Sequence, residues 1–334
     1  MEKFNDSIKG AFFGSLIGDA LGTRYEFKPK KEATLSIIND VKNNKNILPI
    51  LGGGPFELKA GQVTDDSELA LAMFNSIQEK KTYDKEDVAK KYIYWFNSGP
   101  FDCGRTTRIA LSYTKCYNDI VLNSKFKNYE SLSNGCLMRI TPLAIYGCTI
   151  KEEKLLQYCK EDCMMTNPNP LCIKAVQFFC ISIKTAIFIK NKVLIHKTAI
   201  ENANDITLVK LLESAKLRPE PVYINDDYYD TDCHYMGYIG IAIQNAFYEL
   251  LNGNSFDESL INIIKRGGDT DTNACIAGSL LGAYYGYSKI NKKWIESIKI
   301  NPNRSKKYSF VDLTNIENQI EKFIKIILNP NNAK

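Results

Sequence analysis

Residues 61–67 read GQVTDDS and residues 267–272 read GGDTDT, and these two acidic stretches constrain the fold more than any other part of the chain. Each supplies two carboxylates and at least one hydroxyl, the hard oxygen ligands that Mg²⁺ and Mn²⁺ prefer. Four ionised aspartates would balance the charge of two divalent cations. The sequence therefore predicts a dinuclear metal site. If both stretches serve it, the two halves of the chain must fold around each other.

The rest of the sequence is dominated by helical periodicity, and runs of alternating β-branched residues are scarce. We therefore expect an all-α protein with a single large domain over residues 1–330 and a disordered tail at 331–334. Its packed helices would surround a central cleft that holds the metal pair. The predicted helices cover residues 7–21, 66–80, 85–97, 106–117, 138–146, 171–190, 207–215, 238–251, 256–265, 272–285 and 313–328. Polar connections are expected at 39–46, 118–128 and 301–307.

Charge and cysteine content narrow the class of protein. The chain has 334 residues with 43 basic and 38 acidic side chains, and the net charge of +5 is spread without an arginine-rich block. Nucleic-acid binding is therefore not expected. Ten cysteines without a C-x-x-C pair predict buried, reduced thiols. The apolar runs at 11–18 and 175–189 are too short for a signal peptide and for a membrane span, so we expect a cytoplasmic protein.

Both acidic motifs precede apolar, helix-like segments. Thr64 is expected to be a helix N-cap with Asp65 and Asp66 in the first turn, and Thr272 is expected at the start of a second helix. The helix dipole at these positions favours ionised carboxylates. Capping alone would explain either motif. A metal site is favoured because each motif has more carboxylates than a cap uses, and each follows glycine.

Two glycine-bearing loops accompany the acidic motifs. Residues 51–56 read LGGGPF, and residues 133–135 read SNG with Arg139 soon after. Backbone N–H groups in such loops can cradle phosphate or ribose oxygens, and Arg139 would pair with a diphosphate. The alternative for each loop is an ordinary turn, where glycine is common.

These segments together resemble the ADP-ribosylglycohydrolase family, which includes ADP-ribosylarginine hydrolases and the dinitrogenase-reductase-activating glycohydrolase. The resemblance runs from about residue 8 to residue 287, and its segments occur in the family's order. It implies an all-α fold around a cleft with two cations, Mg²⁺ or Mn²⁺. The matching segments are residues 10–22 with Glu26, 52–56 with 61–66, 101–108, 133–139, and 267–286.

The resemblance also implies roles for individual residues. Asp271 would be the ligand shared by both cations, and Thr270 would point away from them. Asn167 stands where the family often has histidine, so a histidine contact to ribose is not expected here. The implied metal ligands are Thr64, Asp65, Asp66, Asp269, Asp271 and Thr272. The implied substrate-binding residues are Gly53, Gly54, Ser133, Asn134, Gly135, Arg139 and Asn167. Glu26 and Asp102 are the candidates for proton transfer, with Asp19 as a supporting residue.

The implied activity is hydrolysis of the bond between C1 of the terminal ribose of ADP-ribose and a protein side chain. Arginine is the favoured leaving group, because residues 101–108 resemble the arginine-directed type. Serine-linked, polymeric and small-molecule ADP-ribose remain alternatives. So do a crystallin-like relative that binds without cleaving and a two-metal hydrolase that cuts a phosphoester. The expected partner is an ADP-ribosylated protein or an ADP-ribose-containing small molecule, and we expect a monomer that binds neither nucleic acid nor membrane.

Overall fold

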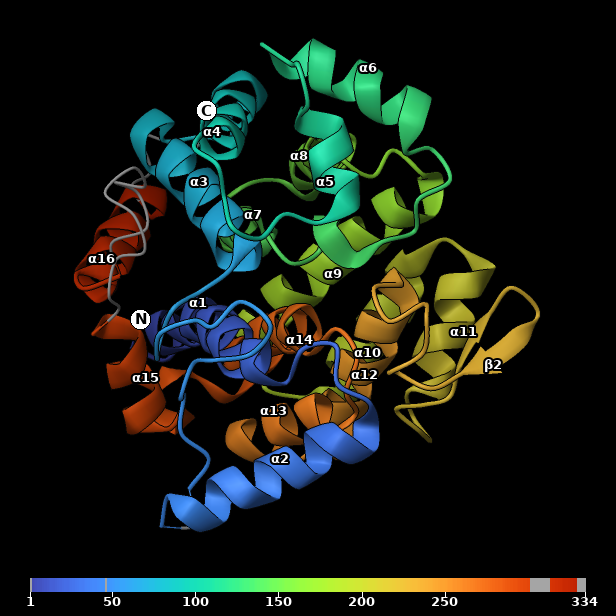
Figure 1. Ribbon diagram of the computed structural model, residues 1–334. Coiled ribbons are helices and arrows are strands. Elements are labelled where there is room, and N and C mark those ends of the chain that lie inside the picture. Colours follow the sequence, from blue (N-terminus) through green and yellow to red (C-terminus); the bar gives the residue numbers. More distant parts are fainter. Residues whose placement is uncertain (1, 46, 301–312, 329–334) are drawn as a thin grey trace.

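Helices form most of the protein in the computed structural model, which describes residues 2–45, 47–300 and 313–328 (Figure 1). The expected all-α fold is therefore confirmed. The α-helices are α1 (Glu2–Gly22), α2 (Lys30–Asn43), α3 (Asp65–Lys80), α4 (Lys85–Asn97), α5 (Arg105–Leu111), α6 (Tyr117–Lys127), α7 (Thr141–Tyr146), α8 (Glu152–Cys163), α9 (Pro170–Phe188), α10 (Lys192–Ala203), α11 (Ile206–Ser214), α12 (Ile239–Asn252), α13 (Phe256–Lys265), α14 (Thr270–Tyr285), α15 (Lys292–Lys299) and α16 (Ile316–Ile327).

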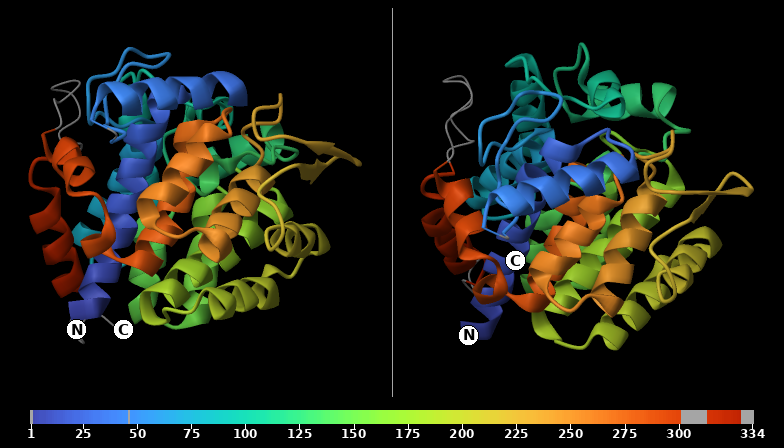
Figure 2. Two further views of the ribbon diagram at one scale, coloured as in Figure 1. Left: turned by 90° about the horizontal axis from the view of Figure 1, so that it is seen from below. Right: turned by 60° about the horizontal axis from the view of Figure 1, so that its bottom comes forward.

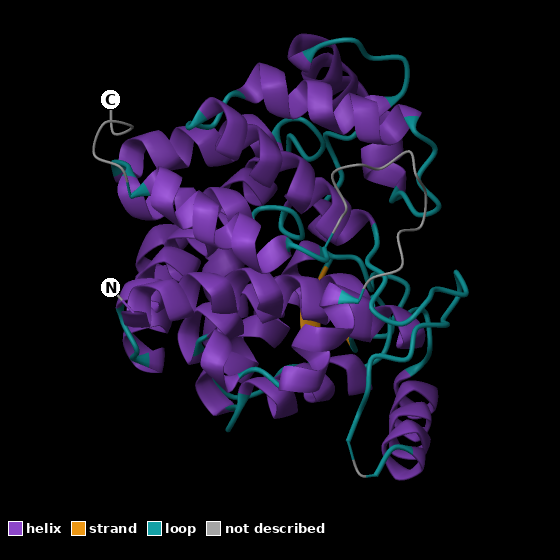
Figure 3. Cartoon of the chain, turned by 90° about the vertical axis from the view of Figure 1, so that its left-hand side faces the viewer, coloured by secondary structure: helices purple, strands orange, loops and turns teal. Residues whose placement is uncertain are grey.

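Four short 3-10 helices and one β-hairpin are the other secondary-structure elements of the described residues. The 3-10 helices are η1 (Thr23–Tyr25), η2 (Asn134–Cys136), η3 (Gly147–Thr149) and η4 (Tyr287–Lys289). Strands β1 (Val222–Ile224) and β2 (Asp227–Tyr229) pair antiparallel. Helices outweigh these strands throughout the described part of the chain (Figure 3). Residues 225–232, which read NDDYYDTD and are rich in aspartate, lie in this hairpin and the loop after it. The predicted tail at 331–334 and the connection at 301–307 lie outside the described residues.

Helices α1 and α14 form the centre of the fold and lie side by side (Figure 1). Glycines on the two helices let their backbones touch, because a Cβ atom added at Gly14 would collide with the carbonyl oxygen of Gly278. The same collision recurs at Gly10 with Gly282 and at Gly18 with Ala274. The order of these pairs shows that the helices run antiparallel. The C-terminal end of α1 therefore meets the N-terminal end of α14.

The remaining helices cover this pair. Helix α14 also packs against α9, α12 and α13, and α1 packs against α3, α7, α15 and α16. Helix α2 lies across one end of the assembly next to α13 (Figure 2). Helix α9 is long enough and apolar enough to cross a membrane, but 61% of its most apolar stretch is buried inside the protein. It is one of the core helices, and it is longer than the apolar run at 175–189 suggested.

The sequence predicted the amphipathic helices well. The bounds of α4 and α13 match the prediction, and most others differ by one to three residues. The predicted helix at 106–117 ends at Leu111, and the predicted connection at 118–128 is helix α6. That prediction was wrong because the Asn- and Lys-rich composition of α6 conceals the buried positions Ile120, Val121 and Ser124. Helices α2, α8, α10 and α15 were not predicted.

We expect Gly14→Ala to lower the free energy of unfolding by about 3 kcal/mol, because the new methyl group would push α1 away from α14. Chemical denaturation would measure the change. Gly104→Ala is the matched control, since a Cβ atom at that position meets nothing within 4 Å. Equal stability of the two variants would contradict the close packing of these helices.

Candidate active site

The N-termini of α3 and α14 carry the two acidic motifs. Thr64 is the N-cap of α3, and its Oγ1 accepts a hydrogen bond from the N–H of Asp66 at 3.4 Å, as the sequence predicted. Helix α14 begins at Thr270 with Asp269 as its N-cap, two residues before the predicted start at Thr272. All four aspartates therefore lie at or within the first turn of a helix, where the dipole stabilises negative charge.

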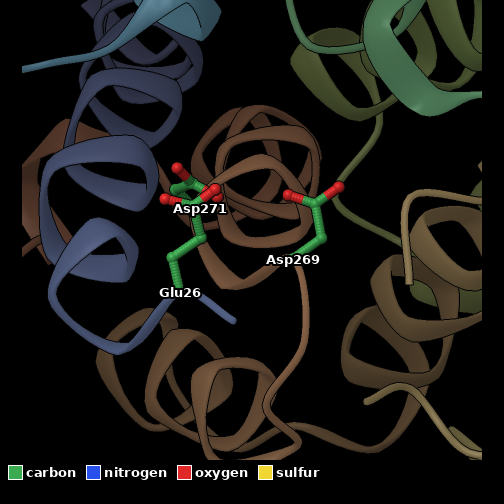
Figure 4. Close-up of side chains that lie close together, drawn as sticks. All are labelled: Glu26, Asp269 and Asp271. Carbon is green, nitrogen blue, oxygen red and sulfur yellow. The ribbon is translucent and has the colours of Figure 1, made fainter. Parts of the chain in front are cut away.

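The two motifs meet in space although about two hundred residues separate them. The hydroxyl of Thr272 donates to Oδ2 of Asp66 at 3.4 Å. Carboxylate oxygens of Glu26, Asp269 and Asp271 lie within 4.8 Å of one another. Figure 4 shows Glu26 reaching from the segment after α1 toward Asp271, with Asp269 at the adjoining start of α14. The fold thus gathers the predicted carboxylates and adds Glu26 to them.

Asp19 fixes the first motif to α1. Its carboxylate accepts hydrogen bonds from the backbone N–H and the hydroxyl of Thr64 and from the same two groups of Ser67, at 2.6–3.2 Å. The side chain is fully buried. Asp19 therefore joins the start of α3 to the last turns of α1, which gives it a positioning role behind the metal motif.

The acidic side chains line a cavity of about 290 Å³. Asp65 is held on its wall by the backbone N–H of Gly104, at 3.1 Å from Oδ2. Asp269 is held by the side-chain amide of Asn134, at 2.7 Å. The cavity is lined by Glu26, Phe27, Asp65, Asp66, Asp102, Gly104, Arg105, Thr106, Thr107, Ser133, Asn134, Gly135, Met138, Met236, Gly237, Asp269, Asp271 and Thr272.

Burial and mutual repulsion make the ionised carboxylates costly here. Burial, followed by the charges of Asp269 and Asp102, raises the pKa of Glu26 to about 9. Burial and the neighbouring acidic groups raise the pKa values of Asp66 and Asp271 well above their ordinary range. Such a cluster lacks sufficient positive charge from the protein, so a bound cation would stabilise it.

Two unpartnered oxygens support a fit to divalent cations. Oε2 of Glu26 and Oδ1 of Asp66 are buried, and neither has a hydrogen-bond partner within the described part of the chain. A buried carboxylate oxygen without a partner is costly unless a cation or water contacts it. The clustered carboxylates and the hydroxyl of Thr272 offer oxygen donors, and no cysteine or histidine is among the described residues that line the cavity. This donor set suits a hard cation.

Two residues that were predicted to bind the substrate, Arg139 and Asn167, lie away from the cavity. Arg139 is fully buried and pairs with Asp162 at 2.9 Å, so its guanidinium is not available to a diphosphate. Asn167 donates to the hydroxyl and the carbonyl oxygen of Ser133 at 3.0 and 3.1 Å. Arg139 also donates to the carbonyl oxygen of Gly135 at 3.0 Å. The predictions of direct contact are corrected, because both side chains support the 133–135 loop from behind.

The two glycines of the 51–56 loop that were predicted to bind substrate, Gly53 and Gly54, are also absent from the cavity wall. The N–H of Gly53 donates to the carbonyl oxygen of Leu58, and Gly54 packs against the backbone of Thr23. This loop is therefore a turn that packs on η1, and the structure does not bring the predicted phosphate cradle to the acidic cavity. Ser133, Asn134 and Gly135 do line the cavity.

Thr270 and Thr64 do not line the cavity. Thr270 points away as predicted, with its hydroxyl on the carbonyl oxygen of Gly22. Thr64 lies one layer behind the wall, with its hydroxyl 3.1 Å from Oδ2 of Asp66.

Several lining residues were not predicted. Phe27 directly follows Glu26 in the sequence, and this position next to a predicted site residue could have indicated it. Met236 and Gly237 come from the loop after the hairpin, and no motif in the sequence marks them. Their approach depends on the contact of that loop with η2, where the N–H of Asn134 donates to the carbonyl oxygen of Gly237 at 2.9 Å.

A second cavity of about 600 Å³ adjoins the first and shares Arg105, Ser133 and Gly237 with it. His234 and Tyr235 line this second cavity, and their ring centroids lie 3.9 Å apart. The two cavities therefore meet at the three shared residues, with the acidic cluster lining one cavity and the aromatic rings lining the other.

The chain belongs to the ADP-ribosylglycohydrolase family, whose sequence profile matches residues 1–322. It is an enzyme of this family. A protein of Acanthamoeba polyphaga mimivirus that carries an ADP-ribosyl glycohydrolase name is 33% identical, over 92% of this chain and 94% of that protein. The ADP-ribosylarginine hydrolase of Pseudomonas putida (strain GB-1) is 27% identical, over 89% of this chain and 75% of that protein.

The fold is also shared with a solved structure described as an ADP-ribosylglycohydrolase-related protein complex. The TM-score is 0.75, and the match covers 98% of this chain and 100% of that chain at 23% identity. The names of the related proteins indicate ADP-ribosyl hydrolase activity for the family.

We expect Mg²⁺ or Mn²⁺ at millimolar concentration to raise the melting temperature by about 5 °C or more, because the cation offsets the repulsion in the cluster. Asp66→Asn should raise the melting temperature of the chelator-treated protein by about 2–4 °C, since it removes one of the repelling charges. The same variant should lose most of the increase that the metal causes. Thermal unfolding with and without chelator would measure both effects.

Asp230→Asn, at an exposed position after β2, is the matched control and should behave as the wild type. An equal metal response in the Asp66 variant and the wild type would contradict a cation site in this cavity.

Proposed function

We propose that this protein removes ADP-ribose from modified arginine side chains by hydrolysing the bond at C1 of the terminal ribose. The observation that carries the proposal is the pair of adjoining cavities, one lined by the carboxylate cluster and the other by aromatic rings. An ADP-ribosyl group has two matching parts, the terminal ribose with the scissile bond and the nucleotide with its base. The relative named as an ADP-ribosylarginine hydrolase supports arginine as the leaving group.

The acidic cluster would hold two cations, Mg²⁺ or Mn²⁺, through Asp65, Asp66, Asp269, Asp271 and Thr272, with Glu26 and Thr64 beside them. When bound, these cations would supply Lewis acidity that lowers the pKa of a coordinated water and grips the ribose hydroxyls. The protein keeps the carboxylates in place through Asp19, Gly104 and Asn134, so the ligand set is preorganised.

The leaving group of a glycoside needs a proton as the C1 bond breaks. Asp102 lies half-buried on the cavity wall, and its charge is one of the causes of the raised pKa of Glu26. Asp102 is therefore proposed to transfer the proton. Glu26 is proposed to contact a cation, because its carboxylate groups with Asp269 and Asp271.

The nucleotide would extend into the second cavity. Arg105 is exposed on the wall that both cavities share, so its guanidinium can pair with the diphosphate. The rings of Tyr235 and His234 would stack on the base, as aromatic side chains do with purines.

The two proton-transfer candidates can be separated by matched amide substitutions. Asp102→Asn should lower kcat about 10²–10⁴-fold and leave the metal-dependent increase in melting temperature intact. Glu26→Gln should reduce that increase as well as the activity, because it removes an oxygen charge from the cluster. Steady-state kinetics and thermal unfolding on the same preparations would measure both quantities. A full loss of the metal response in Asp102→Asn would contradict these assignments.

The substrate is tested by incubation with arginine-linked, serine-linked and poly-ADP-ribosylated proteins, with and without chelator. The proposal predicts release of intact ADP-ribose from the arginine-linked protein and loss of that release when the metal is removed. Release of AMP would instead indicate hydrolysis of the diphosphate bond by a different kind of two-metal hydrolase. Cleavage of only serine-linked or polymeric substrate would contradict the proposed leaving group.

A further inference from the structure

Phe27 has an unusual combination of position and backbone conformation. It lines the acidic cavity directly after Glu26, and 55% of its surface is exposed to solvent. Its φ angle of 61° lies in the left-handed region, which is unfavourable for a bulky side chain. Strained backbone of this kind persists only where surrounding contacts impose it, and it is concentrated at functional sites.

The surrounding contacts come from the second acidic motif. The N–H of Phe27 donates to the carbonyl oxygen of Gly268 at 2.8 Å, and the N–H of Gly268 donates to the carbonyl oxygen of Lys28 at 3.0 Å. This pair of hydrogen bonds fixes the backbone of Phe27 beside Asp269. The ring is therefore held at the rim of the cavity at a fixed position relative to the carboxylate cluster.

The neighbouring lysine does not compete for this ring. The ammonium group of Lys28 donates to the hydroxyl of Ser36 at 3.1 Å and lies over the ring of Tyr25. It is absent from the lining of the acidic cavity. The ring of Phe27 is therefore accessible to a group that enters the cavity from solvent.

The wall that is shared with the second cavity and the rest of the acidic cavity differ in charge. Arg105, the cationic residue of the wall, is shared with the second cavity and so belongs to the end proposed for the nucleotide. Phe27, Glu26 and Asp102 line the acidic cavity and are not shared with the second one. A substrate whose nucleotide lies toward Arg105 presents its leaving group to this acidic and aromatic end.

We infer that Phe27 is a specificity-determining residue whose ring stacks on the guanidinium of the ADP-ribosylated arginine. This inference rests on the proposed function. A planar guanidinium is attracted to an aromatic face and to carboxylates, and the rim offers both kinds of group. A neutral leaving group, such as a serine hydroxyl, gains nothing from the ring's quadrupole. The ring therefore selects a cationic leaving group.

The experiment compares Phe27→Leu with the wild type on ADP-ribosylated arginine in saturating Mg²⁺. Leucine keeps the apolar bulk and removes the π face, so KM should rise about tenfold and at least threefold, with kcat within twofold. The affinity for free ADP-ribose, measured by calorimetry, should stay within twofold. Phe27→Tyr keeps the aromatic face and should restore the wild-type KM.

Phe126→Leu is the matched control, because Phe126 is 88% exposed on α6 and does not line the cavity. The inference is overturned if Phe27→Leu changes KM by less than threefold, or if it weakens free ADP-ribose by the same factor. Either result would make Phe27 a general rim residue. Failure of the wild type to cleave arginine-linked ADP-ribose, while it cleaves another linkage, would overturn the proposed leaving group together with this inference.

Discussion

Backbone contact between α1 and α14 holds the site together. Gly14 and Gly278 leave no room for a side chain between the helices, and this closeness brings the end of α1 to the start of α14. Asp19 then joins the start of α3 to α1, so the first acidic motif is placed against the second. The carboxylates are therefore positioned by helix packing in the core. This explains how motifs about two hundred residues apart form one cavity wall.

The same arrangement brings mutually repelling carboxylates close together. Several carboxylates share one buried cavity, and burial with neighbouring negative charge raises the pKa values of Glu26, Asp66 and Asp271. A rigid core that holds like charges together is less stable than one with neutral residues, unless a counter-ion joins it. The stability of the protein and its affinity for cations are thus coupled. The backbone of Phe27 is also held in an unfavourable conformation, in this case by hydrogen bonds with the segment that carries Asp269.

The sequence predicted the parts of this structure that depend on local chemistry. Side-chain preferences and periodicity, which can be read directly from the sequence, predict the capping role of Thr64 and the bounds of α4 and α13. The roles of Arg139 and Asn167 could not be read in the same way. Each is a polar residue close to the 133–135 loop, and only the packing shows that each supports this loop from the core. Helices α2 and α6 were missed because their polar composition conceals the few positions that they bury. The left-handed conformation of Phe27 could not be predicted from the sequence either, since it is imposed by hydrogen bonds with a segment that follows much later in the chain.

Anomalous diffraction from a crystal of the manganese-loaded enzyme tests the central claim most directly. The account predicts two manganese peaks roughly 3.5–4 Å apart, enclosed by Asp66 from α3 and by Asp271 from α14. Manganese bound elsewhere, with no density between these two helix starts, would contradict it.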